Sequence, residues 1–130
     1  MMSKCVYKDG LPTCTAGEDI AEGSICTLKD GALVPWKTAD DTSSKTVQLF
    51  IAQFDAKKGE HVSVHIAGNT AGTILVPATA GTYTQGAQVF ATDGGKVAAS
   101  GARVVGTALE TVTLADVGIL HIVPQHVPAA

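Results

Sequence analysis

A segment that returns about half a chain later constrains this fold more than any other feature of the sequence. Residues 15–35 read TAGEDIAEGSICTLKDGALVP and residues 79–98 read TAGTYTQGAQVFATDGGKVA, which align with one deletion. The shared landmarks, in chain order, are Thr15-Ala16-Gly17 with Thr79-Ala80-Gly81, Gly23 with Gly86, and Asp30-Gly31 with Asp93-Gly94. The sequence therefore predicts a duplicated β-unit.

The match extends to both sides of this segment. An apolar-Pro pair precedes each copy, and a similar strand closes it, Val64-His65-Ile66 in the first and Leu120-His121-Ile122 in the second. A small repeated unit rarely buries its apolar face alone, so we expect the copies to pack on each other. The predicted organisation is an extended arm over 1–14, a single β domain over 15–123 with units at about 15–66 and 79–123, and an extended tail over 124–130.

Turn residues separate a series of β-prone runs. Asp30-Gly31 supplies the positive φ angles that a two-residue hairpin needs. Residues 47–54 are strongly β-prone and read as buried on at least one face. Residues 73–76 read as a buried strand that Pro77 ends, and the only helix candidate is 110–115. The residues thus predict an all-β fold.

Composition supports the same fold class and excludes several functions. At 130 residues the chain suits one domain with a substantial core. Its 14 glycines and 16% charged residues are typical of a β protein of low charge. A net charge of −3, without clustered Lys or Arg, argues against nucleic-acid binding. The sequence shows neither an 18-residue apolar run nor an apolar signal region, so we expect no membrane span and no secretion.

Three cysteines, Cys5, Cys14 and Cys26, occur without a C-x-x-C pair. Because an odd number leaves one thiol over when the others pair, we expect reduced, structural cysteines. This expectation fits synthesis in a reducing cytoplasm.

No constellation of residues suggests catalysis, a metal or a cofactor. The sequence has no G-x-S-x-G, P-loop or H-E-x-x-H motif. His61 and His65 have a spacing that would suit a metal on a helix, but four strand residues span about 13 Å, beyond the reach of one zinc ion. His65 and His121 read as equivalent polar positions of the two units. Lys29 lies at a hairpin turn, as in biotinyl or lipoyl carriers, but without the flanking Met or Asp of such carriers.

Two segments are candidates for contacts with another molecule. The first is the arm Lys4, Cys5, Val6, Tyr7 and Lys8, which has no counterpart in the second unit and reads either as a docking strand or as a frayed terminus. The second is the polar loop 36–46, with Trp36 and Lys37 at its root. Trp36 reads either as a packed residue at a strand end or as an interface anchor.

The order of these landmarks resembles a known family. T-A-G-x-D-I-x-x-G-x-x-x-x-L-x-x-G is followed by an apolar run, an acidic-Ala-x-x-Gly turn, V-x-V and a second cycle x-x-G-x-x-V-x-A-x-x-G-x-V. This pattern, over about residues 11–123, resembles the head decoration, or capsid cement, proteins of tailed bacteriophages. The first unit departs from the family's Val-Gly-Val-Ala, since it reads Leu49-Phe50-Ile51-Ala52, whereas Val105-Gly106-Thr107-Ala108 keeps the glycine.

The resemblance implies a β-tulip or barrel-like module on the outer surface of the virion shell, made in the host cytoplasm. It implies binding to the major capsid protein, bridging of capsomers and self-association, with a homotrimer favoured and a dimer possible. It implies no enzyme activity, nucleic acid or membrane. The arm is then the candidate for adding a strand to a capsid sheet edge. A small β-clip or barrel module that binds a ligand or carbohydrate is the alternative, although the chain has only six aromatic residues.

Overall fold

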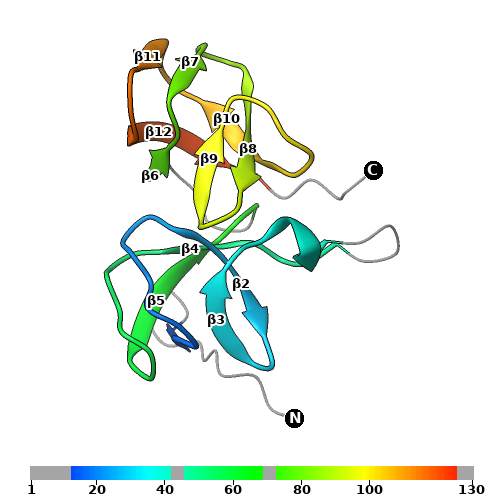
Figure 1. Cartoon of the computed structure of the whole chain (residues 1–130), viewed down its shortest axis with the longest axis vertical. Coiled ribbons are helices and arrows are strands. Elements are labelled where there is room, and N and C mark those ends of the chain that lie inside the picture. Colours follow the sequence, from blue (N-terminus) through cyan, green and yellow to red (C-terminus); the bar gives the residue numbers. More distant parts are fainter. Residues whose placement is uncertain (1–12, 42–45, 69–72, 126–130) are drawn as a thin grey trace.

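Strands account for nearly all of the regular structure. The computed structural model describes residues 13–41, 46–68 and 73–125 (Figure 1). The elements in these ranges are β1 (Thr13–Thr15), β2 (Ile25–Lys29), β3 (Ala32–Pro35), the 3-10 helix η1 (Thr38–Asp40), β4 (Phe50–Ala52), β5 (His61–Ile66), β6 (Ile74–Ala78), β7 (Gly81–Tyr83), β8 (Gln88–Thr92), β9 (Lys96–Ala98), β10 (Val104–Ala108), β11 (Val112–Leu114) and β12 (Gly118–Pro124). The predicted all-β, barrel-like class is confirmed.

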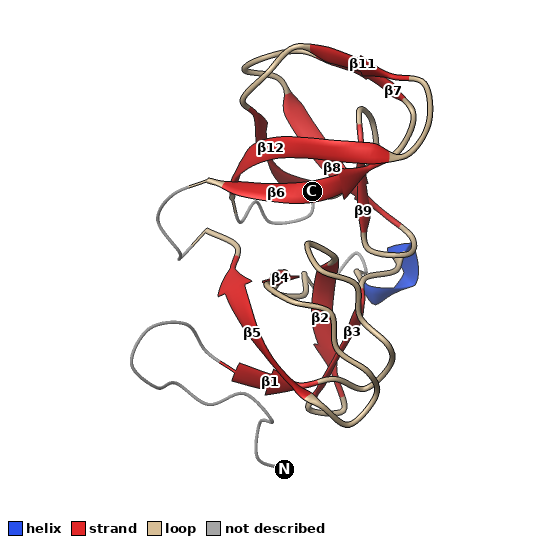
Figure 2. Ribbon diagram, turned by 90° about the vertical axis from the view of Figure 1, so that its left-hand side faces the viewer, coloured by secondary structure: helices blue, strands red, loops and turns tan. Residues whose placement is uncertain are grey.

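The two halves of the chain share one order of strands. The first half forms a sheet in the order β1-β5-β4-β2-β3, and the second half forms a closed barrel, β6-β12-β10-β8-β9 when read from β6. The parallel pair that closes the barrel joins Ala78 to Val97, and a single parallel bridge joins Ala16 to Leu33 in the first half. The barrel lies above the first sheet along the long axis of the molecule, with the β7–β11 ribbon at its far end (Figures 1 and 2).

The backbone hydrogen bonds just after the first strand of each half give a different alignment of the two halves from the one predicted from the Thr-Ala-Gly triplets. Gly17 donates its backbone N–H to the carbonyl of Leu33, and Thr79 donates to the corresponding Val97. Thr15-Ala16-Gly17 therefore matches Pro77-Ala78-Thr79, two residues before the second Thr-Ala-Gly triplet. A slip of two residues keeps every side chain on its own face of the sheet, so the alternation in the sequence does not reveal it.

The predicted equivalence of His65 and His121 is also wrong. The residue before His65 pairs with Ala52, the last residue of β4, whereas the residue after His121 pairs with Ala108, the last residue of β10. The two histidines thus lie two positions apart in the matched ladders. The correspondence between the two histidines is thus set by how β5 pairs with β4 and how β12 pairs with β10, which the sequence of either strand alone does not show.

The two hairpins have turns of different length. Lys29 pairs with Ala32, so Asp30-Gly31 forms the predicted two-residue turn with φ angles of 52° and 80°. Thr92 pairs with Lys96, which leaves the three residues Asp93-Gly94-Gly95, and the positive φ angles fall on the two glycines. Asp93 is therefore not the counterpart of Asp30, and its side chain is available for another contact.

Other element boundaries also differ from the sequence prediction. Within 47–54 only Phe50–Ala52 is strand, and the helix candidate 110–115 instead contains β11, which pairs with β7. Val112 and its threonine neighbours prefer extended backbone, and the partner strand fixes it. Residues 13 and 14, assigned to the arm, belong to β1.

Pro77 lies inside β6 and does not end it, because it pairs with Ile119 of β12. The missing N–H of this proline costs no ladder bond, since its nitrogen is on the β9 side of β6. On that side β6 pairs only at Ala78, and the next backbone N–H to bond is that of Thr79.

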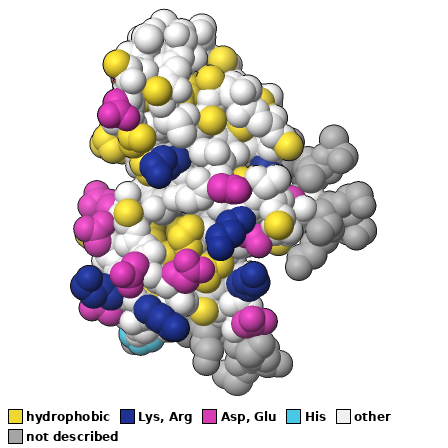
Figure 3. All heavy atoms as spheres, in the orientation of Figure 1, with side chains coloured by type: hydrophobic (Ala, Val, Ile, Leu, Met, Phe, Trp, Pro, Cys, Tyr) yellow, Lys and Arg dark blue, Asp and Glu magenta, His cyan; other side chains and the backbone are white. Residues whose placement is uncertain are grey.

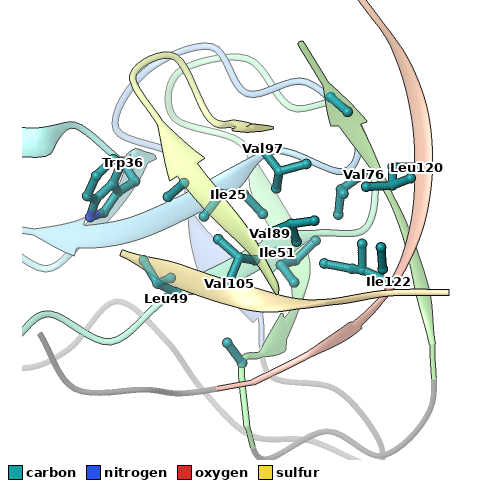
Figure 4. Packing of buried hydrophobic residues seen from close by; sticks show 14 of the residues in the cluster. Ile25, Trp36, Leu49, Ile51, Val76, Val89, Val97, Val105, Leu120 and Ile122 are labelled. Atoms are coloured by element: carbon teal, nitrogen blue, oxygen red, sulfur yellow. The ribbon is translucent and has the colours of Figure 1, made fainter. Parts of the chain in front are cut away.

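Among the described residues, buried apolar side chains form two clusters. The larger one spans both halves and combines Ile25, Trp36, Leu49, Ile51 and Ala67 of the first half with Val76, Ala78, Tyr83, Val89, Ala91, Val97, Val105, Ala108, Leu120 and Ile122 of the second (Figure 4). The smaller one lies within the first half and contains Cys14, Ala16, Ile20, Cys26, Leu33, Phe50, Ala52, Ala56, Val62 and Val64. Because one cluster crosses the boundary between the halves, they pack as one body.

The departure from the family pattern has a packing explanation. Phe50 of β4 is the counterpart of Gly106 in β10, and its ring fills the smaller cluster. A Cβ atom on Gly106 would lie 2.1 Å from the carbonyl oxygen of Val123, because β10 approaches β12 closely where Gly106 pairs with Pro124. Only glycine fits at that position.

The expectation that all cysteines are reduced is wrong for Cys14, which is disulfide-bonded. Cys5 lies outside the described residues. Cys26 is the thiol left over, and it is fully buried in β2. Burial raises the pKa of the Cys26 thiol to about 12, so this side chain behaves as a small apolar core residue.

Candidate interaction surfaces

Of the two predicted contact segments, the structure describes the root of the polar loop and not the arm. The arm residues Lys4, Cys5, Val6, Tyr7 and Lys8 lie outside the described residues. Lys37 is exposed, whereas Trp36 is only 2% exposed and packs in the larger core cluster. Of the two predictions for Trp36, a packed residue at a strand end agrees with its burial in the core.

Trp36 follows the last residue of β3, and its packing in the core anchors the start of the polar loop. Its backbone N–H donates to the carbonyl of Ile25 at 3.0 Å, and its ring lies at one edge of the cluster (Figure 4). The buried indole Nε1 has no hydrogen-bond acceptor among the described residues. Packing, and not polar contact, therefore holds this side chain.

The turn after Trp36 is tied to the opposite half of the molecule. The backbone N–H of Thr38 donates to Asp93 Oδ1 at 2.7 Å, and its hydroxyl donates to the same oxygen at 2.8 Å. These two hydrogen bonds lower the pKa of the Asp93 carboxyl, helped by the charge of Lys37. Within the turn, Lys37 N–H donates to Asp40 Oδ2 at 2.9 Å. Asp93, which receives this link, is the first of the three residues in the second hairpin turn.

A buried ion pair makes a second link between the halves. Arg103, which is 1% exposed, donates from Nη1 to both carboxylate oxygens of Asp41 at 2.8 and 3.0 Å, and from Nη2 to the carbonyl of Val47 at 2.7 Å. Asp41 Oδ1 also accepts the backbone N–H of Val47 at 2.9 Å. Arg103 thus holds both ends of the 41–47 segment against the barrel.

The described histidines His61, His65 and His121 are polar strand residues. His61 contacts Thr15 at 3.2 Å, His121 contacts Thr73 at 2.6 Å, and His65 contacts Gln53. Partial burial lowers the pKa of His65. No group of three potential ligands for a metal ion occurs in the part of the chain that the structure describes.

One hollow at the surface lies between turns. It has a volume of about 520 Å³ and is lined by Asp19, Ile20, Ala21, Asp55, Ala56, Lys57 and Glu60. Its three carboxylates each accept a turn N–H: Asp19 from Lys58, Asp55 from Glu22, and Glu60 from Lys57. These acidic groups therefore stabilise the turns by accepting their backbone N–H groups. The lining contains no aromatic ring on which a sugar could stack.

Charge is divided unequally between the halves. Residues 73–125 carry five charged side chains, Asp93, Lys96, Arg103, Glu110 and Asp116, against twelve in the described part of 13–68. Figure 3 shows the same division, since the basic and acidic side chains gather over the first sheet while the barrel is largely white and yellow. The barrel also carries three of the four large apolar side chains that are strongly exposed among the described residues, Leu75, Val117 and Ile119.

A family model described as "Phage cement protein" matches residues 8–122 of the chain. The chain belongs to the phage cement protein family. The resemblance read from the glycine, Asp-Gly and strand landmarks is thus confirmed. A search of curated proteins finds no match.

Membership of a phage cement family makes this a structural protein of the bacteriophage capsid, in a family that is not one of enzymes. No helix within the described ranges is long and apolar enough to cross a membrane.

Sequence reasoning missed the residues that join the halves. Arg103 was visible as the lone basic residue of a charge-poor stretch, but its partner Asp41 lies 62 positions away, beyond any local pattern. Leu75, expected in a buried strand, is 58% exposed, because β6 is at the surface of the barrel and buries only one face.

Proposed function

We propose that this phage cement protein binds the outer surface of the shell of the major capsid protein and stabilises it by bridging capsomers. The observation that carries the proposal is the shared core. A bridge transmits force only if its two ends cannot move apart, and here one apolar cluster crosses from the first sheet into the barrel. The links of Thr38 to Asp93 and Asp41 to Arg103 reinforce that junction.

This role requires contact area and stiffness, and no reacting group. Many copies on one shell add their contacts, because each bound copy holds its neighbours' sites at high effective concentration. A modest affinity per copy is then enough to raise the stability of the whole shell.

The finer features belong to the same proposal. The protein is made in the host cytoplasm, is located on the outside of the virion and associates with itself, most favourably as a homotrimer and alternatively as a dimer. Because β1 begins at Thr13 and β12 ends at Pro124, residues 1–12 form an arm, 13–124 one β domain of two related units, and 125–130 a tail. Lys4 to Lys8 add a strand to a capsid sheet edge. Lys37 contacts the shell from a loop whose orientation Trp36 fixes.

The test is a binding experiment with empty expanded capsids of the cognate phage. Full-length protein should co-sediment with the shells at saturating, integral copy numbers and raise the temperature at which they break open. A variant lacking residues 2–9 should keep its circular dichroism spectrum and lose binding, whereas a variant lacking residues 126–130 serves as the matched truncation. If the full-length protein does not bind to the shells, the proposed function fails. If the full-length protein binds and the variant without residues 2–9 binds equally well, the contact with the capsid lies outside the arm.

A further inference from the structure

The β6–β12 pair of the barrel exposes an apolar face. Leu75 pairs with His121 and Pro77 pairs with Ile119, so these four side chains share the outer face of the two strands. Leu75 and Ile119 are each 58% exposed, and Val117, 53% exposed, adjoins the start of β12. The two strands lie side by side toward the viewer in Figure 2.

The two strands that carry this face are well packed on their inner side. The alternate residues of the same strands point inward, and Val76, Ala78, Leu120 and Ile122 are all fully buried in the shared core. Both faces of the β6–β12 pair are therefore apolar, as in strands that are covered on both sides. Exposed apolar patches on soluble proteins commonly mark interaction sites.

We infer that the β6–β12 outer face, defined by Leu75, Pro77, Val117, Ile119 and His121, docks against the barrel of a second copy of this chain. The inference deepens the proposed function, because it rests on the self-association proposed there and names the surface responsible.

The distribution of charge selects a second copy, approaching barrel first. The described first half carries eight acidic and four basic side chains, so two copies meeting there bring like charges together. The barrel carries three acidic and two basic side chains, and one of these, Arg103, is buried against Asp41. Contact between two barrels thus has the smallest electrostatic cost, and interface centres are depleted of charge.

The size of the face sets the strength of the contact. The seven residues of β12 extend about 23 Å, and two strands are roughly 10 Å wide, which gives roughly 230 Å² per copy. A stable interface buries about 800 Å² per partner. The face is therefore the centre of a weak, reversible contact in solution, which high local concentration on a shell would strengthen.

Analytical ultracentrifugation of the full-length protein, without capsids, tests the inference over about 10 µM to about 1 mM. We expect the average mass to rise with concentration. Raising NaCl should strengthen association, because salt screens the repulsion between like-charged copies and leaves the apolar contact intact. Leu75→Ser and Ile119→Ser should each weaken association about tenfold, and the double variant should remain monomeric.

Gln88→Ser is the matched control, because Gln88 is exposed on β8, the one barrel strand that pairs with neither β6 nor β12. It should associate like the unmodified chain, and unchanged thermal unfolding of all variants shows that the fold is kept. A strictly monomeric unmodified protein, or a double variant that still associates, overturns the inference. Either result leaves capsid binding by single copies intact, so it is distinguishable from failure of the proposed function.

Discussion

The ion pair of Arg103 and Asp41 joins the two halves of the fold, so replacing Asp41 by Asn measures how strongly they are coupled. The substitution keeps the size of the side chain and removes the anion beside a guanidinium that is 1% exposed. Breaking one side of a buried ion pair costs about 3–5 kcal/mol, because the remaining charge stays desolvated. Asp41 is 11% exposed, so some water reaches it, and we expect the free energy of unfolding to fall by about 3 kcal/mol.

The loss should appear in urea denaturation as a lower midpoint with an unchanged m-value. In thermal unfolding it corresponds to a fall in Tm of roughly 10–15 °C for a chain of this size. Asp40→Asn is the matched control, since among the described residues Asp40 accepts the Lys37 backbone N–H within its own turn, and it should cost no more than about 1 kcal/mol. Equal effects of the two substitutions, or a difference erased by 1 M NaCl, would refute the buried-pair argument.

Three further predictions concern a close approach and two titrating groups. Gly106→Ala should cost at least about 2 kcal/mol in urea denaturation, because the new Cβ would meet the Val123 carbonyl oxygen at 2.1 Å. Asp93→Asn should destabilise the protein at pH 7; since the native pKa of Asp93 lies below 3.8, the difference from the unmodified chain should shrink as the pH falls below 3.8. His65 should titrate below pH 6.5 by NMR, and the stability it contributes in its neutral form should be lost as the pH falls from 6.5 toward that native pKa.

Each of these has an outcome that contradicts it. Gly118→Ala is the control for the close approach, since its Cβ would meet only the side chain of Leu114, and equal losses at both glycines would remove the argument. A difference between Asp93→Asn and the unmodified chain that is constant with pH would show that the hydrogen bonds from Thr38 do not act on the carboxylate. A native midpoint for His65 above 6.5 would show that burial is not its dominant influence.

Local patterns predicted the elements well where a turn residue has one favourable conformation. Asp30-Gly31 gave the correct two-residue hairpin because few other pairs adopt two consecutive positive φ angles. The residues 110–115 misled the prediction, because a short mixed segment has no strong preference and its pairing with β7 decided it. For the candidate surfaces, the sequence identified Trp36 and Lys37 as the root of a loop but did not reveal Asp93 or Arg103 as the residues that hold it.

The sequence by itself determined an all-β chain of two similar parts, a low charge concentrated in the first part, and membership of a cement family whose landmarks are glycines and strand residues. Only the tertiary structure decided which residues of the two parts correspond, because a slip of two positions leaves the alternation of apolar and polar residues unchanged. It also decided that Leu75 and Ile119 face outward and that Arg103 meets Asp41. These facts depend on which strands become neighbours, and the physics of that choice involves residues distant in the chain.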